Sequence, residues 1–255
     1  MDNGLKGLLS SNRRLLGCFI SLRSADLVEL LGHCGIDFVI IDMEHGALSI
    51  TDVADMIRAA HVVGMKALVR VQGTNLFQIG HVLDADADGV VIPRIKTAAE
   101  AEEAARAARF APRGTRGLAL STRACRYGLR DVASFVAASN DSTVVVVQIE
   151  TMSALDDLDR ILAVKEIDAL FIGPLDLSQA LGMTGQTTNP KLLGIVEEVT
   201  RRIRARGIPV GTLTPSAQAA ERWSKAGVQL LTITLSQMLG PFAALVRELR
   251  SAVSE

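Results

Sequence analysis

The segment Val144–Leu181, VVVVQIETMSALDDLDRILAVKEIDALFIGPLDLSQAL, decides the fold. Apolar runs stand at Val144–Val147 and at Ala169–Ile172, and the apolar residues between them recur with the period of an amphipathic helix. Short Val/Ile/Leu runs joined by such a helix are typical of parallel strands buried on both faces. We therefore predict one β–α–β unit in this segment.

Each of these two runs leads to an acidic residue. Glu150 follows the first run, and Asp176 follows the second, after a break at Gly173-Pro174. Neighbouring parallel strands lie roughly 4.8 Å apart, so two acids just past their carboxyl ends could share one small space. Two carboxylates with few other protein ligands are a common way to hold Mg²⁺. Alternatively, each acid caps the helix that follows its strand.

The same alternation of strand-like and helical segments fills the chain. With no composition break that would mark a linker, it predicts one α/β domain over residues 1–255, a closed (β/α)8 TIM barrel. An open doubly wound sheet is the alternative, weakened because no Gly-x-Gly-x-x-Gly turn follows a strand. Strands are expected at residues 16–21, 37–42, 66–71, 89–95, 144–147, 169–172, 208–213 and 230–235, an irregular segment at 111–128, and a last helix at Gly240–Val253.

Composition narrows the function classes. The 255 residues are 49% hydrophobic, enough for a sizeable core, and the net charge of −1 gives no sign of a nucleic-acid or membrane partner. Three cysteines without metal-type spacing are typical of reduced thiols. We find no secretory leader and no apolar run long enough to span a bilayer, and therefore expect a cytoplasmic protein.

In such a barrel the chemistry lies where the strands end. After the second strand, Asp42 and His45 could form a dyad in which the carboxylate orients an imidazole acid/base. A structural histidine is the alternative. Arg70 ends an apolar strand, where its charge is costly unless it meets an anion. A salt bridge to Glu44 or Glu150 would explain Arg70 equally well.

These residues fit one chemistry. A divalent ion and an arginine would polarise the carbonyl of a 2-oxo acid, and a histidine would move the proton. Backbone N–H groups near Gly173-Pro174, before a helix that we expect to begin near Leu177, would hold the carboxylate. No lysine ends a predicted strand: Lys66 opens one, and Lys96 follows Arg94-Ile95. This placement disfavours an aldolase that works through an imine.

Several motifs together resemble the HpcH/HpaI family of metal-dependent (class II) pyruvate aldolases, which are related to citrate lyase β subunits. The resemblance extends from about Gly17 to the C-terminus. It is carried by the Arg70 strand and by DMEHG at 42–46, APRGTRG at 111–117, QIET at 148–151 and GPLDLS at 173–178.

The resemblance implies a barrel of the phosphoenolpyruvate/pyruvate type whose C-terminal helix is swapped between the subunits of a trimer or hexamer. It implies that Glu150 and Asp176 bind Mg²⁺, Mn²⁺ or Co²⁺. His45, paired with Asp42, would act as acid/base through a metal-bound water, and Arg70 would stabilise the C2 oxygen of the pyruvate enolate.

The remaining implied roles concern substrate. The resemblance assigns substrate contacts to Gln148 and to the Gly173-Pro174-Leu175 turn, and places Asp84 near a neighbouring subunit's site. The irregular segment 111–128 would cover the site, with Arg123 matching an arginine of the family loop. Arg23 and Arg126 are additional arginines, and our hypothesis is that they bind distal carboxylates of the substrate.

The resulting prediction is a carbon–carbon lyase. It would cleave a 4-hydroxy-2-oxo acid, possibly a dicarboxylate, to pyruvate and an aldehyde by a retro-aldol reaction. One alternative is a condensing enzyme of the same family, like a citrate synthase of siderophore-type biosynthesis. Another is a non-catalytic binding barrel, which would require a broken metal pair or dyad, and both are present in the sequence.

Overall fold

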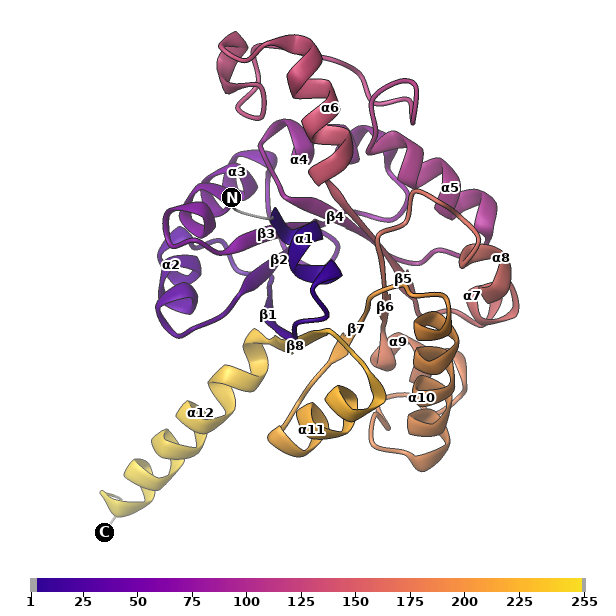
Figure 1. The fold of residues 1–255 in the computed structure, drawn as a ribbon. Coiled ribbons are helices and arrows are strands. Elements are labelled where there is room, and N and C mark those ends of the chain that lie inside the picture. Colours follow the sequence, from indigo (N-terminus) through magenta and orange to yellow (C-terminus); the bar gives the residue numbers. More distant parts are fainter. Residues whose placement is uncertain (1–3, 254–255) are drawn as a thin grey trace.

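The computed structural model describes residues 4–253 and contains a closed barrel of eight parallel strands (Figure 1). Each strand pairs with the next along the chain, and β8 pairs with β1 to close the ring. The predicted (β/α)8 barrel is therefore confirmed. The strands are β1 (Leu15–Ile20), β2 (Phe38–Asp42), β3 (Lys66–Arg70), β4 (Gly89–Ile92), β5 (Val144–Ile149), β6 (Ala169–Ile172), β7 (Val210–Leu213) and β8 (Leu230–Thr234).

Helices surround this barrel, and most begin at a polar N-cap. The side chains of Ser24, Ser49, Asn75 and Thr97 each accept a hydrogen bond from a backbone N–H of the first turn, which satisfies a donor that the helix itself leaves unpaired. The helices are α1 (Gly4–Ser10), α2 (Ala25–His33), α3 (Ile50–Val62), α4 (Leu76–Asp84), α5 (Ala98–Ala107), the 3₁₀ turn η1 (Arg126–Gly128), α6 (Val132–Ser142), α7 (Met152–Asp156), α8 (Leu158–Ile161), α9 (Pro174–Ala180), α10 (Pro190–Ala205), α11 (Ala217–Ala226) and α12 (Leu235–Ala252).

Alternate residues of each strand enter two different cores. Phe38 and Ile40 of β2 point into the barrel, whereas Val39 and Ile41 pack against the surrounding helices. Burial on both sides explains why the strands read as continuous apolar runs. Inside the barrel, the rings of Phe19 and Phe171 meet edge to face with centroids 5.6 Å apart. Side chains of α1 fill the opposite, N-terminal mouth, so the interior is a packed core.

Two strand glycines make room for this interior. A Cβ on Gly17 would overlap the ring of Phe38, and a Cβ on Gly211 would lie 2.7 Å from Cδ2 of Phe171. The large rings therefore depend on the absence of a side chain on the neighbouring strand.

Three elements differ from the sequence prediction. The single helix expected between β5 and β6 is two short helices, α7 and α8. Helix α9 begins at Pro174 instead of near Leu177, because Gly173 is its N-cap and proline suits the first helical position. Helix α12 begins at Leu235 instead of Gly240, since Thr234 and Gln237 form a capping box directly after β8.

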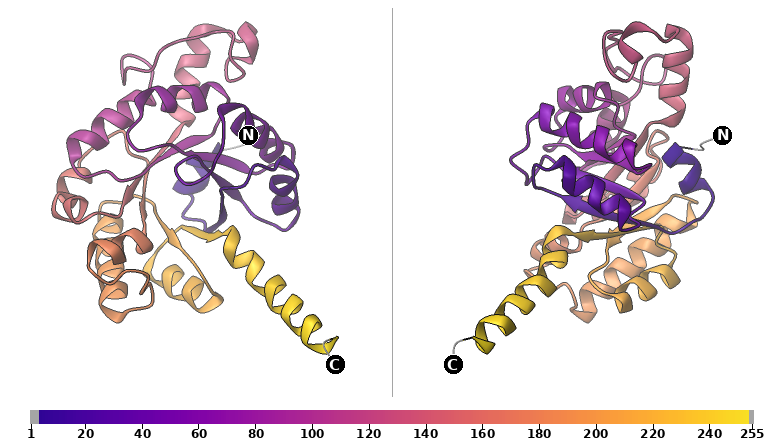
Figure 2. Two further views of the ribbon diagram at one scale, coloured as in Figure 1. Left: turned by 180° about the vertical axis from the view of Figure 1, so that it is seen from behind. Right: turned by 90° about the vertical axis from the view of Figure 1, so that its left-hand side faces the viewer.

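Helix α12 projects away from the barrel, as Figures 1 and 2 both show, and buries none of its residues. Its exposed apolar side chains recur every three or four residues and so form one stripe: Leu239, Phe242, Leu245 and Leu249. No helix in the described part of the chain is both long and apolar enough to cross a lipid bilayer.

Candidate active site

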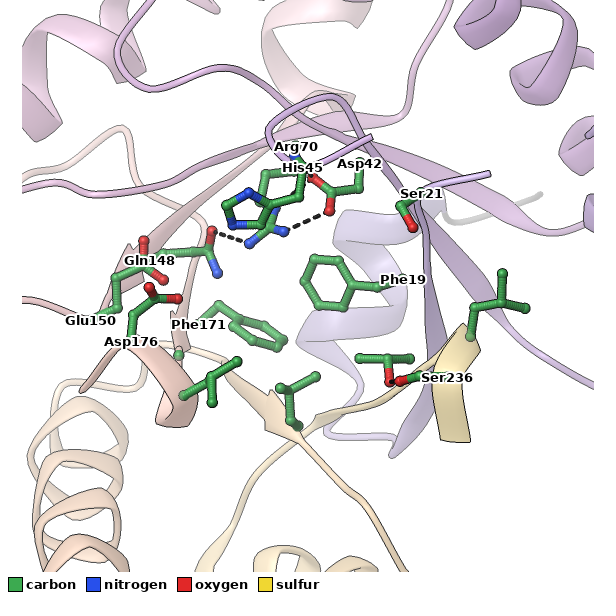
Figure 3. Close-up of a pocket in the computed structure, with 15 residues that line it drawn as sticks. Phe19, Ser21, Asp42, His45, Arg70, Gln148, Glu150, Phe171, Asp176 and Ser236 are labelled. Carbon is green, nitrogen blue, oxygen red and sulfur yellow. Dashed lines mark hydrogen bonds and ion pairs between the residues drawn. The ribbon is translucent and has the colours of Figure 1, made fainter. Parts of the chain in front are cut away.

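A cavity of about 280 Å³ lies at the carboxyl ends of the strands, where a barrel of this kind places its chemistry (Figure 3). It brings together most of the residues predicted from the sequence. Figure 3 shows Glu150, Asp176 and Gln148 on one side of the cavity and Ser21 and Ser236 on the other. The lining residues are Phe19, Ser21, Asp42, His45, Arg70, Gln148, Glu150, Phe171, Gly173, Leu175, Asp176, Leu213, Thr234, Leu235 and Ser236.

Arg70 and Asp42 form a buried, bidentate ion pair. The Arg70 Nη2–Asp42 Oδ2 and Nε–Oδ1 distances are 2.7 and 2.9 Å, a geometry set by the pairing of these two residues in register on β2 and β3. Nη1 faces Gln148 Oε1 at 3.4 Å and Glu44 Oε2 at 3.3 Å. Burial is the largest single influence and disfavours the charged guanidinium, but the hydrogen bonds to Asp42 and the negative charges of Asp42, Glu44 and Glu150 together outweigh it and raise the pKa of Arg70. Arg70 therefore presents a fixed positive charge in the cavity.

The predicted side-chain dyad of Asp42 and His45 is not what the structure shows. Asp42 Oδ1 accepts the backbone N–H groups of Glu44 and His45, at 3.0 and 3.4 Å, while both of its oxygens bind Arg70. The imidazole instead has Glu44 as its nearest carboxylate, with Nε2 4.0 Å from Oε2. The dyad contact is not formed in this structure, because Arg70 is the cross-strand neighbour of Asp42 and binds its carboxylate. His45 still lines the cavity.

Glu150 is buried with one oxygen unused. Its Oε1 accepts the backbone N–H of Arg94 at 2.7 Å, whereas Oε2 has no hydrogen-bond partner among the described residues. The pKa of Glu150 is raised from 4.5 to about 7, chiefly by burial and also by the neighbouring carboxylates of Asp176 and Glu44, although the Arg94 N–H hydrogen bond opposes the rise. Arg94 adopts a left-handed φ of 57°, which is uncommon outside glycine and directs its N–H to Glu150.

The two acids predicted to bind metal lie side by side. Figure 3 shows the Asp176 carboxylate, from the first turn of α9, beside that of Glu150. Gly173 permits this approach, because a Cβ there would lie only 2.5 Å from Glu150 Oε2. A buried, unpartnered carboxylate oxygen next to a second carboxylate fits a hard divalent cation. The described residues contain no cluster of three or more His, Cys, Asp or Glu side chains that could hold a metal ion.

Some predicted substrate residues lie outside the cavity. Arg23 Nε is 3.4 Å from Asp52 Oδ1 at the start of α3, and its side chain points to solvent. Arg126 is exposed in η1. Neither arginine lines the cavity, so the structure gives no support to the distal-carboxylate hypothesis, which stays a prediction. Pro174 lines a neighbouring cavity, although Gly173 and Leu175 on either side of it line this one.

Asp84 and Arg123 lie at the other end of the barrel. Each helix runs back along its strand, so the end of α4 lies near the amino end of β4, away from the cavity. Asp84 Oδ1 accepts a hydrogen bond from Arg116 Nη2 at 2.7 Å. Arg123 Nε donates to Asp86 Oδ2 at 3.3 Å. Within one chain neither residue can contact substrate in this cavity, which corrects the predicted placement of Arg123.

Sequence reasoning missed the apolar part of the site. Phe19, Phe171, Leu213 and Leu235 line the cavity, yet each lies in or beside an apolar run in which no single residue stands out. The alternation of side chains along each strand could have identified them. It places the last inward-facing side chain of each strand next to the site.

Three comparisons place the chain among known proteins. It is 31% identical over 245 residues to a hydroxypyruvate/pyruvate aldolase of Sagittula stellata, covering 96% of each chain. It is 32% identical over 240 residues to a 4-hydroxy-2-oxo-heptane-1,7-dioate aldolase of Escherichia coli, covering 94% of this chain and 91% of that one. A crystal structure of a family protein from Burkholderia cenocepacia J2315 matches with a TM-score of 0.90 and 32% identity, covering 96% and 98%. The family model for HpcH/HpaI aldolase/citrate lyase matches residues 15–239, and the chain belongs to this family of aldolases.

Proposed function

We propose that the protein is a divalent-metal-dependent aldolase that cleaves a 4-hydroxy-2-oxo acid to pyruvate and an aldehyde. The observation that carries this proposal is the unpartnered, buried oxygen of Glu150, which lies beside Asp176 in a cavity that also contains Arg70. The family membership and the names of the two aldolase relatives support the same reaction class.

Glu150 and Asp176 would hold the metal ion, with Mg²⁺, Mn²⁺ and Co²⁺ as the candidates. When bound, the ion acts as a Lewis acid toward the carbonyl and carboxylate oxygens of the 2-oxo acid. The hydrogen bond from the Arg94 N–H fixes Glu150 Oε1, so that Oε2 remains directed at the cation.

Arg70 and Gln148 would bind the pyruvate half of the substrate. Asp42 fixes the plane of the Arg70 guanidinium, which therefore needs no reorganisation to donate to the C2 oxygen as negative charge develops there. Gln148 is 2% exposed and directs its Oε1 toward Arg70, which leaves its amide N–H group for the substrate. Gly173 and Leu175 line the cavity beside the acids, and we place the substrate carboxylate at this turn.

His45 would move the proton. Imidazole is the side chain most often used for proton transfer in enzymes, and this one lines the cavity with its side chain about half exposed. In cleavage it accepts the proton of the C4 hydroxyl as the C3–C4 bond breaks, which releases the aldehyde and leaves pyruvate as its enolate. A proton returned to C3 completes pyruvate. Glu44, 4.0 Å from Nε2, stabilises the imidazolium formed in between.

The stripe on α12 supports an assembly of several copies. A projecting helix whose apolar face covers nothing in its own chain is expected to pack on another copy. We propose that α12 is exchanged between subunits of a trimer or hexamer, and that Asp84 approaches a neighbouring subunit's site. Phe242→Glu is expected to shift the mass measured by light scattering toward the monomer, whereas Arg247→Glu on the same helix should not.

Pyruvate release from 4-hydroxy-2-oxo acids, followed by coupled reduction to lactate, tests the reaction. We expect turnover that requires Mg²⁺, Mn²⁺ or Co²⁺, stops with EDTA and is lost in Asp176→Asn. Turnover in EDTA would contradict the metal-dependent mechanism. Metal binding without cleavage of any such acid would favour the condensing alternative.

A further inference from the structure

A second cavity, of about 540 Å³, adjoins the candidate active site. The two cavities share the lining residues Leu175, Leu213, Thr234 and Ser236, so they adjoin at these four residues. The second cavity extends sideways from the ends of β7 and β8 to the facing sides of α10 and α11.

The inner wall of this second cavity is apolar. It is formed by Leu193 and Val196 of α10 and by Ala219 and Trp223 of α11, and the indole of Trp223 is only 4% exposed. The other lining residues include threonine, serine and glutamine, which are polar but uncharged. Neutral walls of this kind suit an uncharged hydrocarbon or aromatic group.

No free charge lines the second cavity among the described residues. Of the described residues that line it, only Arg222 is charged, and its Nε donates to Glu197 Oε1 at 2.8 Å. The guanidinium also lies 5.5 Å from the centroid of the Trp223 ring. An anionic tail would therefore have to displace Glu197 from the Arg222 guanidinium to find a positive partner in this cavity. A neutral tail needs no charged partner.

The size of the first cavity makes an extension necessary for longer substrates. At about 280 Å³ it falls below the roughly 300–1,000 Å³ typical of ligand pockets, and it has to contain the pyruvyl group and the cation. A substituent on C4 that is more than a few carbons long must leave this space. The second cavity is the adjoining apolar volume.

We propose that the second cavity binds a neutral, apolar tail on the aldehyde half of the substrate. This inference rests on the proposed aldolase function and defines its substrate class: 4-hydroxy-2-oxo acids whose C4 substituent is an alkyl or aryl chain. The tail passes Leu213 and Leu175 and packs against Val196, Ala219 and Trp223.

A series of aldehydes tests the proposal in the direction of aldol addition to pyruvate. From propanal to hexanal, kcat/KM is expected to rise about fourfold for each added methylene. This factor corresponds to the free energy gained when one methylene group is buried. Succinic semialdehyde, which carries an anionic tail, should react less well than hexanal. A flat series, or a preference for the anionic aldehyde, would overturn the proposal.

Two adjacent alanines of α11 provide matched variants. Ala219 lines the second cavity and Ala220 does not, although both are partly exposed on the same helix. Ala219→Phe should lower the hexanal-to-propanal ratio of kcat/KM at least tenfold, and Ala220→Phe should leave that ratio unchanged. Equal ratios in the two variants would refute the assignment.

Trp223 gives a readout that needs no turnover, because it is the only tryptophan of the chain. Bromohexanol, whose bromine quenches indole fluorescence on contact, should quench Trp223 saturably in the wild type and in Ala220→Phe but not in Ala219→Phe. Absence of saturable quenching would show that the cavity is closed to ligands or filled by another copy, and would overturn the proposal. Metal-dependent exchange of the pyruvate methyl protons by the same sample reports the aldolase function separately, so either assignment can fail alone.

Discussion

Glu150→Gln removes a buried carboxyl group whose pKa is raised from 4.5 to about 7. Because the folded protein binds this proton more tightly than the unfolded chain does, the carboxyl group contributes stability below its unfolded pKa. That contribution is lost as the pH rises through about 7. A shift of this size corresponds to about 3 kcal/mol, of which about 2.5 kcal/mol is lost between about pH 5 and pH 8.5. The glutamine variant has no such titration.

The assay is urea unfolding in EDTA of both proteins, at one protein concentration and at these two pH values. The difference in free energy of unfolding, wild type minus Glu150→Gln, should fall by about 2.5 kcal/mol toward high pH. Saturating Mn²⁺ at high pH should restore about 2.7 kcal/mol to the wild type alone, at a concentration of about 100 times its Kd. A difference independent of pH would refute the burial argument, and equal stabilisation of both proteins by Mn²⁺ would refute the ligand assignment.

Three further predictions concern the groups around Glu150. Arg70→Ala leaves the Asp42 carboxylate buried and unpaired, so the free energy of unfolding should drop by about 3–5 kcal/mol; an unchanged urea midpoint would contradict this. Gly173→Ala brings a methyl group to Glu150 Oε2, so calorimetry should show metal affinity at least tenfold weaker, with the circular dichroism spectrum retained. Arg94→Gly relieves a left-handed φ and keeps the N–H that Glu150 accepts, so metal affinity should be unchanged while stability rises by about 0–1 kcal/mol; weaker metal binding would show that the side chain matters.

The barrel and its metal pair could be predicted because both follow from local patterns. Buried parallel strands read as apolar runs, and their parallel order brings Glu150 and Asp176 together. The pairing of Asp42 with Arg70 depends on the register between β2 and β3, which no local pattern gives. The sequence suggested the nearer residue, His45, as the partner.

Other features depend on long-range packing. Arg23 and Arg123 are basic residues in loops, and the acids that bind them, Asp52 and Asp86, are distant in sequence. The second cavity is formed by the facing sides of α10 and α11, each of which reads as an ordinary amphipathic helix. The sequence of neither helix therefore indicates that a cavity lies between them.

The most direct test of the account is proton–deuterium exchange of the pyruvate methyl group, followed by NMR in D₂O with Mg²⁺ or Mn²⁺ and then with EDTA. We expect exchange that needs the metal and is lost in Glu150→Ala, since the buried acid pair would hold the cation that favours enolisation. Exchange that continues in EDTA, or at the wild-type rate in Glu150→Ala, would contradict it.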